Sequence, residues 1–233
     1  MTVAQHPDVA QIMLPGQAAA APGPLNMTNM YLAHYGFRRD LGRLLTAVSR
    51  VDIRDRKRIS ALRELFTWVL ASLHHHHTSE DEMIWPRLRE RAPEAIETID
   101  ALEAEHEAAD RWIHESTDAF LTFDTGPSEQ GRDRLASALR ALADTLGAHL
   151  AHEETEGIPL MMAYITPEED ARMHQQILKR YRPADVLKLV AWSTFDLPPE
   201  VEAHLRRTSP KLLRLLSSLV KGRYRRRMAY LWG

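Results

Sequence analysis

The sequence contains no cysteine. Disulfides, thiolate metal sites and iron–sulfur clusters are therefore excluded, and His, Asp and Glu are the only strong metal-ligand side chains left. No uninterrupted apolar run approaches the roughly 20 residues of a membrane-spanning helix. The N-terminus also lacks a basic segment, and Pro15, Pro22 and Pro24 interrupt its apolar residues, unlike a signal peptide. We therefore expect a cytoplasmic protein without a transmembrane segment.

The length and charge of the chain indicate one globular unit with an appendage. It has 233 residues, 44% of them hydrophobic, and a net charge of -2; this length can bury a sizeable core, and the charge does not favour nucleic acid as a partner. From Arg206 onward there are nine Lys or Arg and no acidic residue. We interpret this end as a solvated face of a helix that packs on the bundle or completes a homo-oligomer. An acidic partner, an anionic membrane or nucleic acid is the alternative.

Composition divides the chain into three parts. Residues 1–24 are rich in Ala, Pro, Gln and Gly without periodicity, which predicts a flexible or loosely docked arm. Residues 25–165 carry long amphipathic patterns, and residues 166–233 form a helical extension that is basic at its end. Prolines mark the expected boundaries of the helices in this extension, at about 167–181, 183–193, 199–206 and 210–228.

Apolar residues at three- and four-residue steps predict four long helices. The first covers about residues 26–50. The second begins within 52–58 and continues through Pro86, which should kink it. The third begins near Pro93 and ends in the polar turn 122–131, and the fourth leads through Leu135 to Glu153. Because short turns join these helices, the sequence predicts an all-α fold: an antiparallel four-helix bundle with additional C-terminal helices.

Histidines and glutamates recur on the apolar stripes. In the run His74 to His77, His76 and Glu80 are i and i+4 neighbours on one face of a helix, and His149 and Glu153 repeat this spacing. A buried carboxylate without a cation beside it costs several kcal/mol. One shared set of metal ligands explains all of the inward-facing residues: His34, His76, Glu80, His106, His149 and Glu153.

This ligand set suits two adjacent metal ions better than one tetrahedral zinc. Two divalent ions bring four positive charges, and two glutamates with one bridging hydroxide remove three of them. Imidazole and carboxylate ligands without sulfur favour iron over manganese or zinc. We therefore expect two iron ions, bridged by an oxide or a hydroxide, that bind dioxygen, peroxide or nitric oxide.

The spacing and local contexts of these residues resemble the hemerythrin-like (HHE cation-binding) family. The matching stretches are His34 to Leu41, His76 to Asp81 followed by Trp85-Pro86, Glu105-His106, and His149 to Glu154 followed by Pro159. The resemblance covers about residues 26–165. It implies a four-helix bundle with a non-haem di-iron centre that reacts with oxygen or related small molecules.

The third helix departs from the pattern of the oxygen carriers in that family. They present two histidines four residues apart, whereas His106 has Leu102 and Asp110 at those distances. One iron could lack a ligand, Asp110 could replace it, or another histidine could fill the position. The pairs His77 with Asp81 and His152 with Glu154 could be ligands or could orient the ligands; for His77 and Asp81 we favour the orienting role.

Two functions follow from this interpretation. The first is a di-iron protein that binds dioxygen, peroxide or nitric oxide or consumes one of them by redox turnover. The second is a non-catalytic sensor or metal-binding module that signals through its C-terminal helices. The departure on the third helix favours turnover or sensing over oxygen transport.

Overall fold

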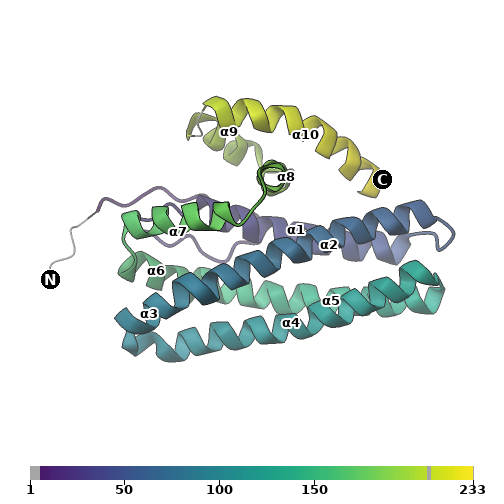
Figure 1. Cartoon of the computed structure of the whole chain (residues 1–233), viewed down its shortest axis with the longest axis horizontal. Coiled ribbons are helices and arrows are strands. Elements are labelled where there is room, and N and C mark those ends of the chain that lie inside the picture. The colour runs from purple at the N-terminus through teal and green to yellow at the C-terminus, as the bar shows by residue number, and fades with distance from the viewer. Residues whose placement is uncertain (1–5, 209–210, 233) are drawn as a thin grey trace.

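The computed structural model describes residues 6–208 and 211–232, with side chains for residues 6–208 and 222–232. Over this part every regular element is helical and there is no strand. Four long helices lie side by side as a bundle (Figure 1). They are α1 (Thr28–Arg50), α2 (Arg56–Ser79), α4 (Ile96–Thr125) and α5 (Glu129–His152). The predicted all-α bundle is confirmed.

Side-chain caps start two of these helices. The carboxylate of Asp55 accepts a hydrogen bond from the backbone N–H of Arg58, and the hydroxyl of Ser128 accepts one from Gly131. Such caps satisfy N–H groups that have no partner within the helix. The two caps therefore fix the residues at which α2 and α5 begin.

The interior consists of two apolar clusters. The first contains Phe37, Leu73 and Leu150, and the second contains Trp85 and Leu102. Helices α1 and α4 contribute residues to both clusters, whereas α2 and α5 contribute to the first and the segments that follow them, residues 83–88 and 158–162, contribute to the second. The buried histidines and glutamates therefore form one polar layer across the bundle, with apolar packing on both sides.

The helix geometry changes directly after each His-x-x-x-Glu pair. The π-helical segments η1 (Glu80–Ile84) and η3 (Glu153–Gly157) each begin at the glutamate. They are followed by α3 (Trp85–Arg91) and α6 (Ile158–Tyr164), whose second residues are prolines. Proline lacks an N–H and clashes with the preceding turn, and a wider turn accommodates it. The kink predicted at Pro86 therefore takes the form of a π-helical turn, and Pro159 has the same effect.

Short elements complete the chain. The 3₁₀ turn η2 (Pro93–Ala95) leads into α4, and the extension contains α7 (Pro167–Lys179), α8 (Pro183–Ser193), α9 (Pro199–Thr208) and α10 (Lys211–Trp232). Figure 1 shows the extension on the side of the bundle formed by α1 and α2. The apolar residues of the first part of the last helix have side chains outside the described part: Leu212, Leu213, Leu215, Leu216, Leu219 and Val220.

The extension is anchored through Trp192 of α8. Its ring is fully buried, and its Nε1–H donates a 2.8 Å hydrogen bond to Oδ2 of Asp40 on α1. A Cβ atom at Gly36 would lie 2.6 Å from this ring, so only glycine permits such close packing at that position. The extension is therefore packed into the core of the bundle.

The N-terminal arm differs from the expectation for residues 1–24. Over the described residues 6–24, Ile12 and Leu14 are buried in the second apolar cluster. The backbone N–H of Ala21 donates to the hydroxyl of Tyr31, and the N–H of Val9 donates to the carbonyl of Gly23. The arm is thus docked on the bundle through irregularly spaced apolar residues, a pattern that periodicity does not reveal. Residues 1–5 lie outside the described part.

Within the described residues, no helix combines the length and apolar character needed to cross a membrane.

Candidate metal centre

The six residues predicted as ligands meet in the polar layer of the bundle. His34 comes from α1, His76 from α2, His106 from α4 and His149 from α5, while each glutamate is the first residue of a π-helical segment. All are buried except His76, whose side chain is 12% exposed. Four helices therefore supply the cluster, and the structure adds His77 from α2.

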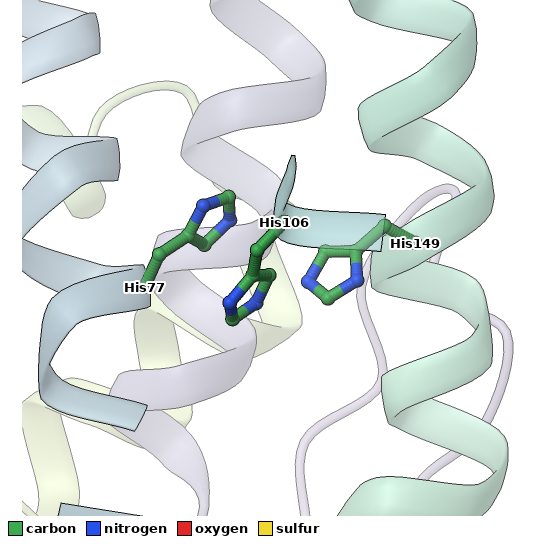
Figure 2. A group of neighbouring side chains, drawn as sticks. All are labelled: His77, His106 and His149. Atoms are coloured by element: carbon green, nitrogen blue, oxygen red, sulfur yellow. The ribbon is translucent and has the colours of Figure 1, made fainter. Parts of the chain in front are cut away.

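One group consists of His77, His106 and His149. One ring nitrogen of each lies within 4.8 Å of the others, and Figure 2 shows the three rings converging from three helices. The rings of His77 and His106 are stacked with centroids 3.9 Å apart, and those of His106 and His149 are 4.6 Å apart. Three buried imidazoles at this separation form a suitable set of nitrogen ligands.

A second group consists of His34, His76 and Glu153. Nε2 of His34 lies 3.2 Å from Nε2 of His76 and 3.2 Å from Oε2 of Glu153. This group lies on the side of α1 and the first lies on the side of α4. The two groups share the same polar layer.

Both glutamates lie between the two groups. Oε1 of Glu80 is 3.2 Å from Nε2 of His76, and its Oε2 is 3.5 Å from Nε2 of His106. Oε2 of Glu153 is 4.0 Å from Nε2 of His149, and Glu80, His149 and Glu153 form a third group of close ligand atoms. Each carboxylate therefore lies within reach of imidazoles from both groups.

The inward atoms of this cluster lack hydrogen-bond partners outside it. They are Nε2 of His77, His106 and His149 and both carboxylate oxygens of Glu80 and Glu153, all fully buried. Buried polar atoms without partners are rare because each costs about 1–3 kcal/mol, and charged ones cost more. Their convergence on one place fits metal ions, which would satisfy all of them together.

The outward nitrogens of three histidines contact carboxylates. Nδ1 of His34 lies 2.9 Å from Glu154, Nδ1 of His106 lies 2.9 Å from Asp81, and Nδ1 of His149 lies 3.0 Å from Glu105. An ionised carboxylate accepts a proton-bearing Nδ1, which leaves the lone pair on Nε2 facing inward. Each ring is thereby held in the tautomer that binds metal.

The family model for the hemerythrin HHE cation-binding domain matches residues 27–181. The chain belongs to this family. No curated protein and no solved structure matches it. The matched region of the HHE domain covers the four long helices and extends through α7, beyond residue 165, where the sequence resemblance ended.

Glu154 connects the candidate metal site of the HHE domain to two other parts of the chain. Arg38 donates to both of its oxygens, at 2.7 and 3.1 Å, and the backbone N–H of Ala18 donates to Oε2 at 2.7 Å. Burial raises the pKa of Glu154, but hydrogen bonds from His34 and Arg38 outweigh this effect and lower it below its ordinary value. The docked arm thus helps to keep the partner of His34 ionised.

Burial strongly shifts the titration of the central groups. It lowers the pKa of His76 to about 3, with the nearby His34 adding to the effect, and it also lowers the pKa of His77. Burial and the charge of Glu153 raise the pKa of Glu80. Burial opposes ionisation of Glu153, but His34 and its neighbours lower its pKa to about 2. Neutral imidazoles beside a carboxylate are the protonation states that bind a cation.

His34 shows two opposing effects. Burial lowers its pKa, whereas Glu153 and Glu154 raise it, and the net shift is upward. A metal ion beside His34 would replace a proton on its inward nitrogen. The same carboxylates that favour the proton would therefore favour the metal.

The residues left open by the sequence occupy different places in the domain. His77 lies in a ligand group itself, and Asp81 and Glu154 contact Nδ1 of ligand histidines. His152 contacts Glu105 at 2.9 Å and belongs to none of the close groups in the described chain. Asp110 is exposed and also lies outside these groups, so His77 is better placed than Asp110 to complete the set.

Sequence reasoning gave no role to Glu105. Its two oxygens contact Nδ1 of His149 and Nδ1 of His152, joining α4 to α5. Its position directly before His106 was visible in the sequence. Its function was not, because its partners are more than 40 positions away and follow no local spacing.

Proposed function

We propose that this HHE domain holds two iron ions and that the di-iron centre binds or reacts with dioxygen, peroxide or nitric oxide. His77, His106 and His149 would hold one ion, and His34 and His76 would hold the other. Glu80 and Glu153 would reach both. When bound, such a pair of ions supplies redox chemistry toward small oxidants.

One observation carries this proposal: the buried carboxylates of Glu80 and Glu153 lie among two groups of imidazoles, and none of their four oxygens has a hydrogen-bond partner outside this cluster. A single tetrahedral zinc uses four ligands and would leave part of this set without a partner. Nitrogen and oxygen donors without sulfur favour iron, and the membership in a cation-binding family supports a bound cation at this place.

The chain itself prepares the site in three ways. Glu154, Asp81 and Glu105 fix the orientation of three histidines. The fully buried rings of Trp85 and Tyr31 belong to the cluster that closes one side of the polar layer and help to exclude water. The lowered pKa values of His76 and His77 keep both rings neutral at ordinary pH.

The test is the metal content of protein purified without added metals, with visible absorption recorded before and after adding oxygen, hydrogen peroxide or nitric oxide. We expect about two irons per chain and an absorption change with at least one of these molecules. Glu80→Ala should lose metal and melt at lower temperature, whereas the exposed Glu107→Ala should do neither. Zinc alone, or no metal with an intact fold, would contradict the proposal.

A second candidate is a non-catalytic sensor. The ring of Phe37 lies 5.4 Å from that of His76 and 5.1 Å from that of Trp192, so the second ligand group is in contact with the extension through one side chain. A sensor would bind its small molecule stoichiometrically without turnover, and its proteolysis pattern in α8 would change. Multiple turnovers with peroxide or nitric oxide would favour the redox function instead.

A further inference from the structure

A cavity of about 270 Å³ lies outside the four-helix bundle, between α1 and α2 on one side and α7 and α8 on the other. Figure 1 shows α7 and α8 beside this face of the bundle. The cavity is lined mainly by apolar side chains, among them Met27, Met30, Met173, Ile177, Val190 and Trp192. The C-terminal extension therefore encloses a space that the four helices would not form by themselves.

The volume of this cavity exceeds what a diatomic molecule needs. One water occupies about 30 Å³ of liquid, and an apolar cavity of about 150 Å³ stays dry and binds benzene. A space of about 270 Å³ fits an organic molecule with two fused rings or a compact branched chain. Its apolar walls disfavour filling by water.

The charges around the cavity favour a neutral occupant. Its described lining contains no Lys, Arg or Glu. Its aspartate, Asp170, contacts His174 through Oδ1 at 3.3 Å, and this contact raises the pKa of His174. A charged molecule would lose its hydration here without gaining an unpaired opposite charge.

The cavity also reaches the metal site. Within the described chain, His76 is the member of the two ligand groups that contributes to its lining. His76 is also the most exposed of these residues. A molecule in the cavity would contact the His76 ring from outside the bundle.

We propose that this cavity binds a compact, uncharged, apolar organic molecule directly beside His76. Binding depends on the shape and lining of the cavity and does not require a metal. The effect of the bound molecule on the metal centre rests on the proposed function, because it requires His76 to be a ligand.

The probe is 1-naphthol, which has two fused rings and is uncharged at neutral pH. We expect isothermal titration calorimetry to detect one site per chain, in protein with and without metal. Ile177→Trp, which places a larger side chain in the cavity wall, should weaken binding at least about tenfold. Leu121→Trp is the matched control, since Leu121 is 52% exposed on α4 and outside the cavity; it should leave binding unchanged.

Two further measurements sharpen the test. Ala33→Phe fills the cavity from α1 and replaces Ile177→Trp if that variant does not fold. The anion 1-naphthoate should bind at least about tenfold more weakly than 1-naphthol. In the iron-loaded protein, 1-naphthol should shift the visible absorption.

The proposal is overturned if 1-naphthol does not bind the wild-type protein, or if Ile177→Trp and Ala33→Phe bind it as tightly as Leu121→Trp does. Equal binding of 1-naphthoate would overturn the preference for an uncharged molecule. If the protein contains no iron but binds 1-naphthol as described, the proposed di-iron function fails while the cavity assignment stands.

Discussion

Oε1 of Glu154 lies 2.9 Å from Nδ1 of His34, although the two residues are 120 positions apart in the sequence. The contact joins η3 to α1 and fixes the tautomer of one candidate ligand. Glu154 also accepts hydrogen bonds from Arg38 and from the backbone of Ala18. One carboxylate thereby links the N-terminal arm, the bundle and the candidate metal site.

Glu154→Gln tests this link. The amide keeps the size of the side chain but removes the charge that pairs with Arg38 and holds the proton on Nδ1 of His34. Loss of such an outer partner costs about 10- to 100-fold in metal affinity, and an imperfectly satisfied Arg38 costs about 1–3 kcal/mol of stability. Competition with a chelator and urea unfolding measure the two effects. The exposed Glu168→Gln serves as control, and equal metal affinity in both variants would show that Glu154 does not support the site.

The four consecutive histidines of α2 provide a matched pair. His77 is buried in a ligand group, whereas His74, in the same run, is exposed. His77→Ala should lower the iron content from about two to about one per chain, because one ion would lose a ligand. His74→Ala should keep the full content. Iron analysis together with visible absorption measures this content. An unchanged iron content in His77→Ala would show that His77 orients the ligands and is not a ligand itself.

Two neighbouring residues in the arm test whether it is docked in solution. Leu14 is buried against the bundle, whereas Met13 is 56% exposed. Leu14→Ala should destabilise the protein by about 2 kcal/mol or more because it leaves a cavity, and Met13→Ala should change stability by less than about 0.5 kcal/mol. Urea unfolding measures the difference. Equal, small effects would support the flexible arm that the composition predicted.

Gly157 lies beside a candidate bridging carboxylate. A Cβ atom there would lie 3.0 Å from Cγ of Glu153 and 3.1 Å from Cδ1 of Leu102, closer than ordinary van der Waals contact. We expect Gly157→Ala to displace Glu153 and to lower metal affinity.

Gly147→Ala is the control for this substitution. An added Cβ at Gly147 meets no atom within 4 Å, and alanine favours the helix by about 0.5–1 kcal/mol, so this variant should melt at a higher temperature and keep its metal. A Gly157→Ala protein with unchanged metal affinity would show that the side chains of Glu153 and Leu102 can move aside without weakening metal binding.

The sequence determined the long helices and most of the candidate ligands, because both depend on local spacing. Apolar residues at a period of 3.6 mark helices whatever their partners are, and the i, i+4 spacing places His76 with Glu80 and His149 with Glu153 on common faces. Pro86, after the first pair, likewise predicted that the helix changes there, since the cause lies in the covalent chemistry of proline.

Only the tertiary structure decided how these residues are grouped. His76 and His77 are adjacent in the sequence, and their side chains point about 100° apart on the helix. Because α2 has a neighbouring helix on each side, His76 contacts His34 of α1 and His77 contacts His106 of α4. The role of Glu105, the docking of the arm and the cavity beneath α7 and α8 also depend on contacts between distant segments. Such contacts depend on how distant segments pack together, and this packing produces no regular spacing of residues in the sequence.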